Sequence, residues 1–168
     1  PLAAIKEGIT SGTPVSQLMQ EMPSASDMLL GTVPGSLGEI SALMLIIGGL
    51  YMLFKKVITW EIPVSILGSV AIIAGIFWLA DPQSFVNPVY HLLTGGLMLG
   101  AIFMATDMVS SPMTSKGQII YGVGIGVITI LIRLFGAYPE GISFAILIMN
   151  AFTPLINNYV KPKRFGGN

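Results

Sequence analysis

Two clusters of glycine, hydroxyl and carboxylate residues are the places where this sequence could hold a ligand. The first is Gly35-Ser36-Leu37-Gly38-Glu39-Ile40-Ser41, at the start of a long apolar stretch. Glycines let the backbone approach a ligand closely, and the free N–H groups of a helix start can hold an anion or a carbonyl oxygen. The pattern predicts a cofactor-binding set made of Gly35, Ser36, Gly38, Glu39 and Ser41.

The same residues also fit a simpler structural role. Ser36 can be the N-cap of a helix, and Glu39, three residues later, can complete a capping box. A carboxylate at the edge of an apolar helix is costly unless it is paired or solvated. The residues alone support a capping role and a ligand-binding role equally, and one residue can fill both.

The second cluster lies in segment 105–118, where five hydroxyl side chains and one carboxylate stand between two apolar stretches. Its predicted ligand-contacting residues are Thr106, Asp107, Ser110, Ser111 and Thr114. Composition alone favours an ordinary polar loop, in which Asp107 and Ser111 cap the next turn.

Several other kinds of chemistry are excluded by what the sequence lacks. There is no Cys, so disulfides, thiolate metal sites and cysteine nucleophiles cannot form. A single His, with no cluster of His and carboxylates, predicts no protein-ligated metal centre. No phosphate-binding loop, dinucleotide fingerprint or hydrolase elbow is present, so we assign no catalytic residue. The zero net charge, without a basic face, argues against nucleic acid as a partner.

Long apolar helices must position the two clusters. The 168 residues are 53% hydrophobic and only 10% charged, with a mean hydropathy of +0.80. About twenty apolar residues cross a bilayer as a helix, and the qualifying windows are 37–54, 62–79, 89–105, 119–135 and 142–160. A soluble bundle would need polar faces, but window 62–79 offers only Pro63, Ser65 and Ser69. The prediction is an all-α, polytopic membrane bundle of about five transmembrane helices.

The basic residues predict how this bundle is oriented in a cell inner membrane, because positive charge stays on the cytoplasmic side. Six of the eight basic residues fall on one side if the spans alternate: Lys55, Lys56, Lys116, Lys161, Lys163 and Arg164. Arg133 lies one turn from the other face and is expected to snorkel toward it. Residues 1–36 are thus an extracytoplasmic or re-entrant segment, 37–160 the five-helix domain, and 161–168 a cytoplasmic tail.

Polar and small residues within the spans carry further expectations. The stripes Thr94-Gly95-Gly96 and Gly122–Gly126 indicate close helix packing, with a flat cofactor or an ion against them as the sharper alternative. His91 is expected at the outer interface. Asn150 and Pro154 suggest a break in the fifth span that lines a cavity.

The two clusters also resemble the signatures of one membrane-protein family. Gly38-Glu39-Ile40-Ser41, before an apolar helix, is similar to that family's G-E-T-S segment. Residues 103–114, with Gly117-Gln118 and Tyr121-Gly122 after them, resemble its second signature. The family comprises the D subunit of the Rnf ferredoxin:NAD oxidoreductase and the B subunit of the Nqr sodium-pumping NADH:quinone oxidoreductase. The form Met108-Val109-Ser110-Ser111-Pro112-Met113 favours the Rnf D subunit.

The resemblance implies a membrane subunit of a redox-driven Na+ or H+ pump that works with other membrane and peripheral subunits. Its implied fold is two inverted five-helix repeats, similar to a urea channel, with this chain as the second. FMN is expected on a Thr just before Pro1, upstream of this sequence, and riboflavin or a second flavin is an additional expectation. Thr13, in Ser11-Gly12-Thr13-Pro14, lacks the Ala of the family's attachment motif and is a secondary candidate. A channel for a small polar solute is the alternative from another class.

Overall fold

The computed structural model describes residues 24–31, 41–82, 85–94, 96–136 and 140–161. Every regular element within these residues is helical, and they contain no strand. In chain order the elements are α3 (Ala25–Leu30), α4 (Ala42–Phe54), α5 (Glu61–Ala80), α6 (Pro88–Leu93), α7 (Leu97–Leu99), the π-helix η1 (Gly100–Met104), α8 (Ser115–Phe135) and α9 (Ile142–Tyr159). The all-α prediction is confirmed.

Three of these helices, α5, α8 and α9, are long and apolar enough to cross a membrane, with 20, 21 and 18 residues. At 1.5 Å per residue, each spans about 27 to 32 Å, close to the thickness of a hydrocarbon core. The fourth apolar helix, α4, has 13 residues. Its window was predicted to begin at residue 37, which lies outside the described residues. These helices form a polytopic helical membrane protein.

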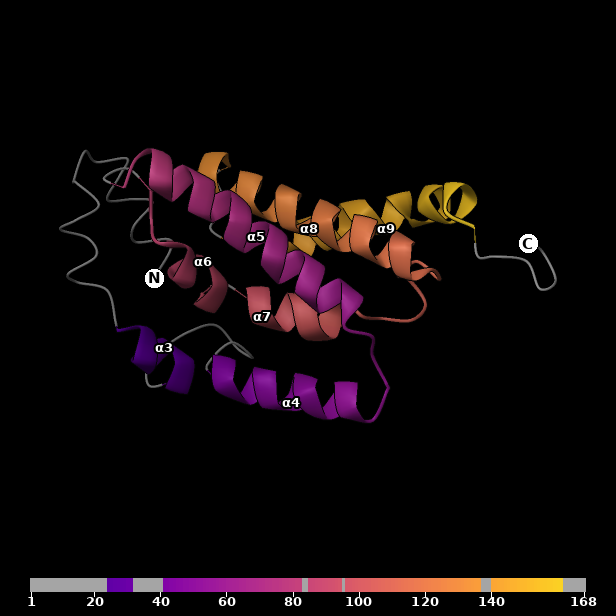
Figure 1. Cartoon of the computed structure of the whole chain (residues 1–168), viewed down its shortest axis with the longest axis horizontal. Coiled ribbons are helices and arrows are strands. Elements are labelled where there is room, and N and C mark those ends of the chain that lie inside the picture. The colour runs from indigo at the N-terminus through magenta and orange to yellow at the C-terminus, as the bar shows by residue number, and fades with distance from the viewer. Residues whose placement is uncertain (1–23, 32–40, 83–84, 95, 137–139, 162–168) are drawn as a thin grey trace.

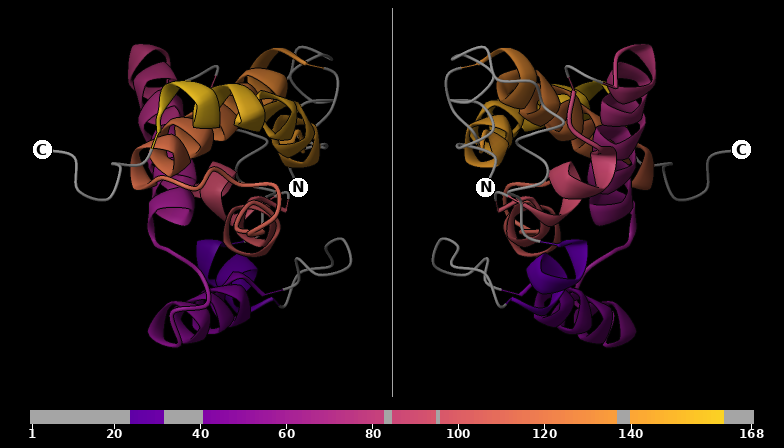
Figure 2. Two further views of the ribbon diagram at one scale, coloured as in Figure 1. Left: turned by 90° about the vertical axis from the view of Figure 1, so that its right-hand side faces the viewer. Right: turned by 90° about the vertical axis from the view of Figure 1, so that its left-hand side faces the viewer.

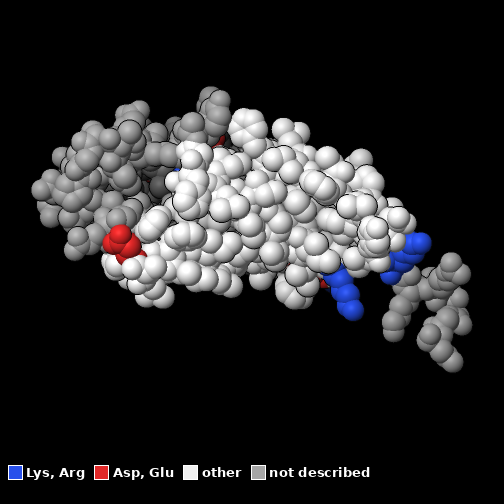
Figure 3. Space-filling view, turned by 90° about the horizontal axis from the view of Figure 1, so that it is seen from above, with Lys and Arg blue, Asp and Glu red and all other residues white. Residues whose placement is uncertain are grey.

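Successive passes run in opposite directions (Figure 1). The ends of α4, η1 and α9 lie at the same end of the molecule as the starts of α5 and α8. We call this the basic end, because Lys55, Lys56, Lys116 and Lys161 border these helix ends. Between the ends, the face in Figure 3 is a broad surface without charge. Large apolar side chains such as Phe54, Leu79 and Leu147 are exposed on the surface of the protein, as contact with lipid requires.

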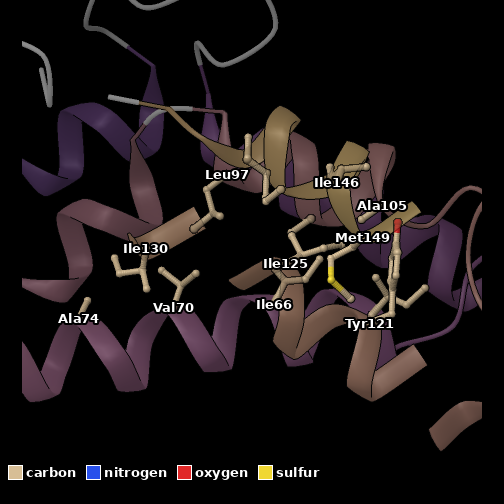
Figure 4. Close-up of a cluster of buried hydrophobic side chains, with 14 residues drawn as sticks. Ile66, Val70, Ala74, Leu97, Ala105, Tyr121, Ile125, Ile130, Ile146 and Met149 are labelled. Atoms are coloured by element: carbon tan, nitrogen blue, oxygen red, sulfur yellow. The ribbon is translucent and has the colours of Figure 1, made fainter. Parts of the chain in front are cut away.

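The tightest packing is between α5 and α8. A Cβ added to Gly122 would lie 1.8 Å from the Ser65 hydroxyl, and one added to Gly126 would lie 1.8 Å from the Ser69 hydroxyl. The two glycines therefore let the helices touch, which confirms the close-packing interpretation of this stripe. The surrounding core, shown in Figure 4, includes Ile66, Val70 and Ile125, all fully buried.

The fifth pass is not broken as predicted. Helix α9 continues from Ile142 to Tyr159 with Pro154 inside it. The Asn150 Oδ1 accepts a hydrogen bond from the Tyr121 hydroxyl of α8. The hydroxyl of Thr153 donates to the Met149 carbonyl, 3.2 Å away. Asn150 thus ties α9 to α8 through Tyr121.

The break lies instead in the third pass. Window 89–105 was predicted as one helix, but the chain forms α6, leaves the helix at Thr94, and resumes as α7 and the π-helix η1. Thr94 is extended and Gly96 has φ +60°, a left-handed conformation that suits glycine. The end views in Figure 2 place α7 and η1 between α4 and the layer formed by α5, α8 and α9. The prediction of a continuous third span is therefore wrong.

Candidate functional site

The break in the third pass faces the start of α4 across a hollow. The hollow is small, with a volume of about 10 Å³, enough for about one water molecule. Its lining residues, most of them apolar, are Ala42, Leu45, Leu93, Thr94, Gly96, Leu97, Met98 and Leu99. Gly96 contributes backbone without a side chain, and Thr94 contributes a polar backbone at the point where the helix ends. The hollow is therefore a small, mostly apolar depression with exposed backbone at the helix break.

The start of α4 beside this hollow is fixed by Ser41. The Ser41 hydroxyl accepts a hydrogen bond from the Met44 N–H at 3.4 Å and donates to the Leu29 carbonyl at 3.2 Å. It therefore caps α4 and ties that helix to α3. Ser41, and not the predicted Ser36, is the N-cap. The other predicted residues of this cluster, Gly35, Ser36, Gly38 and Glu39, lie outside the described residues, as does Thr13.

Behind the hollow, Arg133 of α8 holds the broken pass together. Its guanidinium donates from Nη1 to the His91 carbonyl, from Nη2 to the Thr94 carbonyl at 2.9 Å, and from Nε to the Glu140 carbonyl at 3.1 Å. The side chain is 5% exposed. Arg133 does not snorkel to the surface, because the carbonyl groups freed by the helix break bind it inside the bundle. Sequence reasoning missed this role, since the acceptors are backbone atoms far along the chain.

His91 is also buried inside the protein, at 4% exposure, and its place at the outer interface stays a prediction. Its Nδ1 is buried and has no hydrogen-bond partner among the described residues, and the same holds for the Thr129 hydroxyl. Thr129 precedes Arg133 by one turn of α8, so both side chains lie on the same side of that helix. Arg133 is thus buried together with two other polar side chains, those of His91 and Thr129.

The second cluster forms a turn at the basic end, between η1 and α8. We call residues 106–114 the polar loop. Asp107 is exposed, and its Oδ2 accepts hydrogen bonds from the Ser110 N–H at 3.3 Å and the Ser110 hydroxyl at 3.1 Å. The Ser111 N–H donates to the Asp107 carbonyl at 3.1 Å. Asp107 thus stabilises the turn, and the structure brings Asp107, Ser110 and Ser111 together.

The remaining hydroxyls of the polar loop serve the backbone. Thr106 donates to the Ile102 carbonyl at 2.7 Å, which ends η1. Thr114 is the N-cap of α8, accepting from the Gly117 N–H at 3.1 Å, and it donates to the Val160 carbonyl at 3.3 Å. The structure therefore assigns Thr106 and Thr114 anchoring roles, while Asp107 faces outward.

Side chains that sequence reasoning missed fix the loop to its neighbours. The Asn157 Oδ1 of α9 accepts from the Met113 N–H at 3.2 Å. Gln118 donates to the Pro112 carbonyl at 3.2 Å and accepts from the Thr59 hydroxyl at 2.9 Å. The polar loop is thus held by α8, α9 and the segment before α5. Among the described residues, no group of three His, Cys, Asp or Glu side chains could hold a metal ion.

The fold defines a polytopic helical membrane protein. Its third pass is broken beside a hollow, and the polar loop lies at its basic end. The sequence model of the NQR2, RnfD, RnfE family matches residues 1–166. This chain belongs to that family.

The chain is similar to D subunits of ion-translocating oxidoreductase complexes. It is 52% identical over 139 residues to the D subunit of the proton-translocating ferredoxin:NAD(+) oxidoreductase complex of Clostridium ljungdahlii, covering 83% of this chain and 42% of that protein. It is 49% identical over 168 residues to the D subunit of the Na(+)-translocating ferredoxin:NAD(+) oxidoreductase complex of Acetobacterium woodii, covering 99% and 48%. It is 40% identical over 165 residues to the D subunit of the ion-translocating oxidoreductase complex of Halorhodospira halophila, covering 98% and 46%. The chain thus spans less than half the length of these relatives.

Proposed function

We propose that this chain is part of a membrane subunit of an ion-translocating ferredoxin:NAD oxidoreductase, which carries electrons through flavin while the assembly moves Na+ or H+. The family match and the names of the relatives support this function. Those relatives are named for different ions, one for protons and one for Na+. The chain functions with other membrane and peripheral subunits and does not complete the reaction alone.

The cofactor in this proposal is FMN, attached to a Thr immediately before Pro1. The observation that supports its placement is the start of α4, which the Ser41 hydroxyl fixes at the end of the predicted cofactor-binding stretch. Ser41 ends the predicted cofactor-binding stretch, and the next residue, Ala42, lines the hollow. Leu45, Leu93 and Leu97 make this neighbourhood of the stretch apolar. When bound, flavin supplies electron transfer, while the protein holds the ring and tunes its potential by hydrogen bonds.

The polar loop serves the opposite side in this proposal. The hollow and the basic end lie at different depths of a bundle about as thick as the hydrocarbon core, roughly 30 Å. A flavin at the far side cannot exchange electrons efficiently with cytoplasmic donors over that distance, so a second cofactor or an ion path must approach the inner mouth. We propose that the polar loop, with Asp107 facing outward, helps line a site for a cation, or for riboflavin or a second flavin.

The flavin proposal is tested on the full-length protein purified within its complex. We expect in-gel flavin fluorescence after denaturation and an intact mass increased by one FMN phosphoester. Changing the acceptor Thr before Pro1 to Val removes both signals if attachment is there, whereas Thr13→Val leaves them unchanged. A full-length protein without fluorescence and without added mass would favour the channel alternative. Reduction of quinone in place of NAD by the assembly would favour the Nqr B type.

A further inference from the structure

Helix α4 ends at the basic end in a turn that carries a lysine where glycine is usual. The Lys56 N–H donates to the Leu53 carbonyl at 3.0 Å. The Val57 N–H donates to the Met52 carbonyl at 2.9 Å. This pair of bonds is a Schellman motif, in which the residue after the helix cap is left-handed and is most often glycine. Lys56 takes that place with φ +56°, which a glycine adopts more easily. The backbone alone therefore does not account for a lysine here.

The preceding Lys55 holds its charge beside the apolar part of α4. Its Nζ lies over the Tyr51 ring, 5.8 Å from the ring centroid. Tyr51 is 63% exposed, whereas Gly49 on the other side of the helix is buried against Ile102 of η1. Trp60, which is 59% exposed, follows before α5. Because Tyr and Trp gather where a membrane meets water, these residues indicate that the end of α4 lies at the level of the lipid headgroups.

A third lysine lies near this pair, because the segment after α4 is bonded to the start of α8. The Thr59 hydroxyl donates to Gln118 Oε1 at 2.9 Å, and Lys116 comes two residues before Gln118. Lys55, Lys56 and Lys116 are all exposed, and we call them the lysine cluster. Within the part of the chain that the structure describes, their ammonium groups make no hydrogen bond and no ion pair.

The acidic side chains at this end do not neutralise the lysine cluster. The Asp107 Oδ2 accepts hydrogen bonds from Ser110, and Oε2 of Glu61, at the start of α5, is buried. Among the described residues, neither carboxylate pairs with a lysine. The three positive charges of the cluster are therefore available to an anion outside this chain.

We propose that the lysine cluster binds the phosphate of an anionic phospholipid, whose acyl chains lie along the exposed side of α4. That side carries large apolar or aromatic side chains: Met44, Ile47, Tyr51 and Phe54. Figures 1 and 2 place α4 at the margin of the molecule, separated from α5, α8 and α9 by α7 and η1. A phospholipid matches both features, because its phosphate is negative and its chains are apolar. Such a site depends on neither the flavin nor the transported ion.

The test uses the full-length protein in its complex, purified in detergent and stripped of lipid. Phosphatidylglycerol is titrated in, and bound lipid is counted by native mass spectrometry, with phosphatidylcholine as the zwitterionic reference. We expect Lys55→Gln combined with Lys56→Gln to weaken binding of phosphatidylglycerol by about 25-fold, since each lysine near a membrane surface contributes about 1 kcal/mol, or about fivefold. Binding of phosphatidylcholine should not change. An unchanged affinity for phosphatidylglycerol in this double variant would contradict the site.

Lys56→Gly separates the charge from the backbone conformation. Glycine fits φ +56°, so the thermal midpoint of the lipid-free complex should stay the same or rise. The affinity for phosphatidylglycerol should nevertheless fall about fivefold, and Lys56→Arg should keep it. If Lys56 only compensates the dipole at the end of α4, Lys56→Gly lowers the midpoint and leaves lipid binding unchanged, which overturns its role in the site.

A matched control removes a cation from the same end but outside the lysine cluster. Lys161→Gln should leave the affinity for phosphatidylglycerol unchanged, and a fivefold loss there would show general charge attraction and overturn the proposal. Displacement of the lipid by excess inorganic phosphate would also overturn it, because the acyl chains would then contribute nothing. If the intact complex does not bind phosphatidylglycerol, and the double variant instead loses a peripheral subunit, the cluster binds an acidic protein and the lipid site is refuted.

Discussion

At the scale of single residues, Asp107 combines a structural contact with an exposed charge. Its carboxylate accepts two hydrogen bonds from Ser110, which is what a turn-stabilising aspartate does. An amide oxygen could accept the same bonds. The negative charge is thus not required by the turn itself, and its position at the inner mouth is what the proposed function uses.

We predict that Asp107→Asn separates these roles. Asparagine keeps an acceptor for Ser110 and removes the charge, so the complex should assemble normally and transfer electrons, while ion movement per electron falls to background. The measurement is ion uptake by membrane vesicles together with ferredoxin-dependent NAD reduction in the same preparation. Fully coupled transport in Asp107→Asn would contradict a charge-dependent site in the polar loop.

At the scale of elements, the sequence could predict the helices whose length and composition suffice to define them. Windows 62–79, 119–135 and 142–160 match α5, α8 and α9 within a few residues, because a continuous apolar stretch in a membrane can only be a helix. The break at Thr94 was not predictable in this way, since hydropathy averages over a window and leaves a Thr-Gly-Gly stretch hidden inside it.

The candidate site was predictable only where its contacts are local. The turn around Asp107 and Ser111 is the structure that composition favours, because its partners lie within four residues. The contacts of Arg133 with His91 and Thr94 bridge 42 and 39 residues, and they involve carbonyls that every residue carries. Asn150 is the converse case. Its amide suggests a cavity in the sequence, but in the structure it accepts a hydrogen bond from Tyr121, 29 residues away.

The contact of α5 with α8 leads to a prediction about stability. Gly126→Ala would place a Cβ 1.8 Å from the Ser69 hydroxyl and 2.9 Å from the Ile66 carbonyl, so the two helices must separate. Overpacking of this kind costs about 1–3 kcal/mol. Gly68→Ala, in α5, meets nothing within 4 Å and should leave stability unchanged or slightly higher. The check is the thermal midpoint of the detergent-purified complex, and equal midpoints for the two variants would contradict this account of the packing.

At the scale of the whole molecule, the alternating passes separate two chemically different ends. The basic end carries Lys55, Lys56, Lys116 and Lys161 along with the polar loop. The opposite end carries α3 and the end of α5 at Ala80. Arg133, buried in the last turn of α8, lies toward this end. From the positive-inside rule we expect the basic end to face the cytoplasm.

We predict that this orientation holds in intact cells. Pro82→Cys, just after α5, should react with a membrane-impermeant maleimide added outside, and Lys116→Cys, at the start of α8, should react only after the cells are opened. Both positions are exposed, so burial does not account for a difference. Labelling of Lys116→Cys in intact cells would invert the topology and move the polar loop to the outer face.

The broken third pass has a consequence for how the protein is made. Its freed carbonyls at His91 and Thr94 enter the membrane before Arg133, which follows 42 and 39 residues later, has been synthesised. At about 5–20 residues per second, translation leaves these groups waiting roughly 2–8 s. During that interval the insertion machinery, or water at its lateral gate, must satisfy them. We therefore expect the third and fourth passes of this chain to leave the translocation site as a pair, once Arg133 can bind these carbonyls.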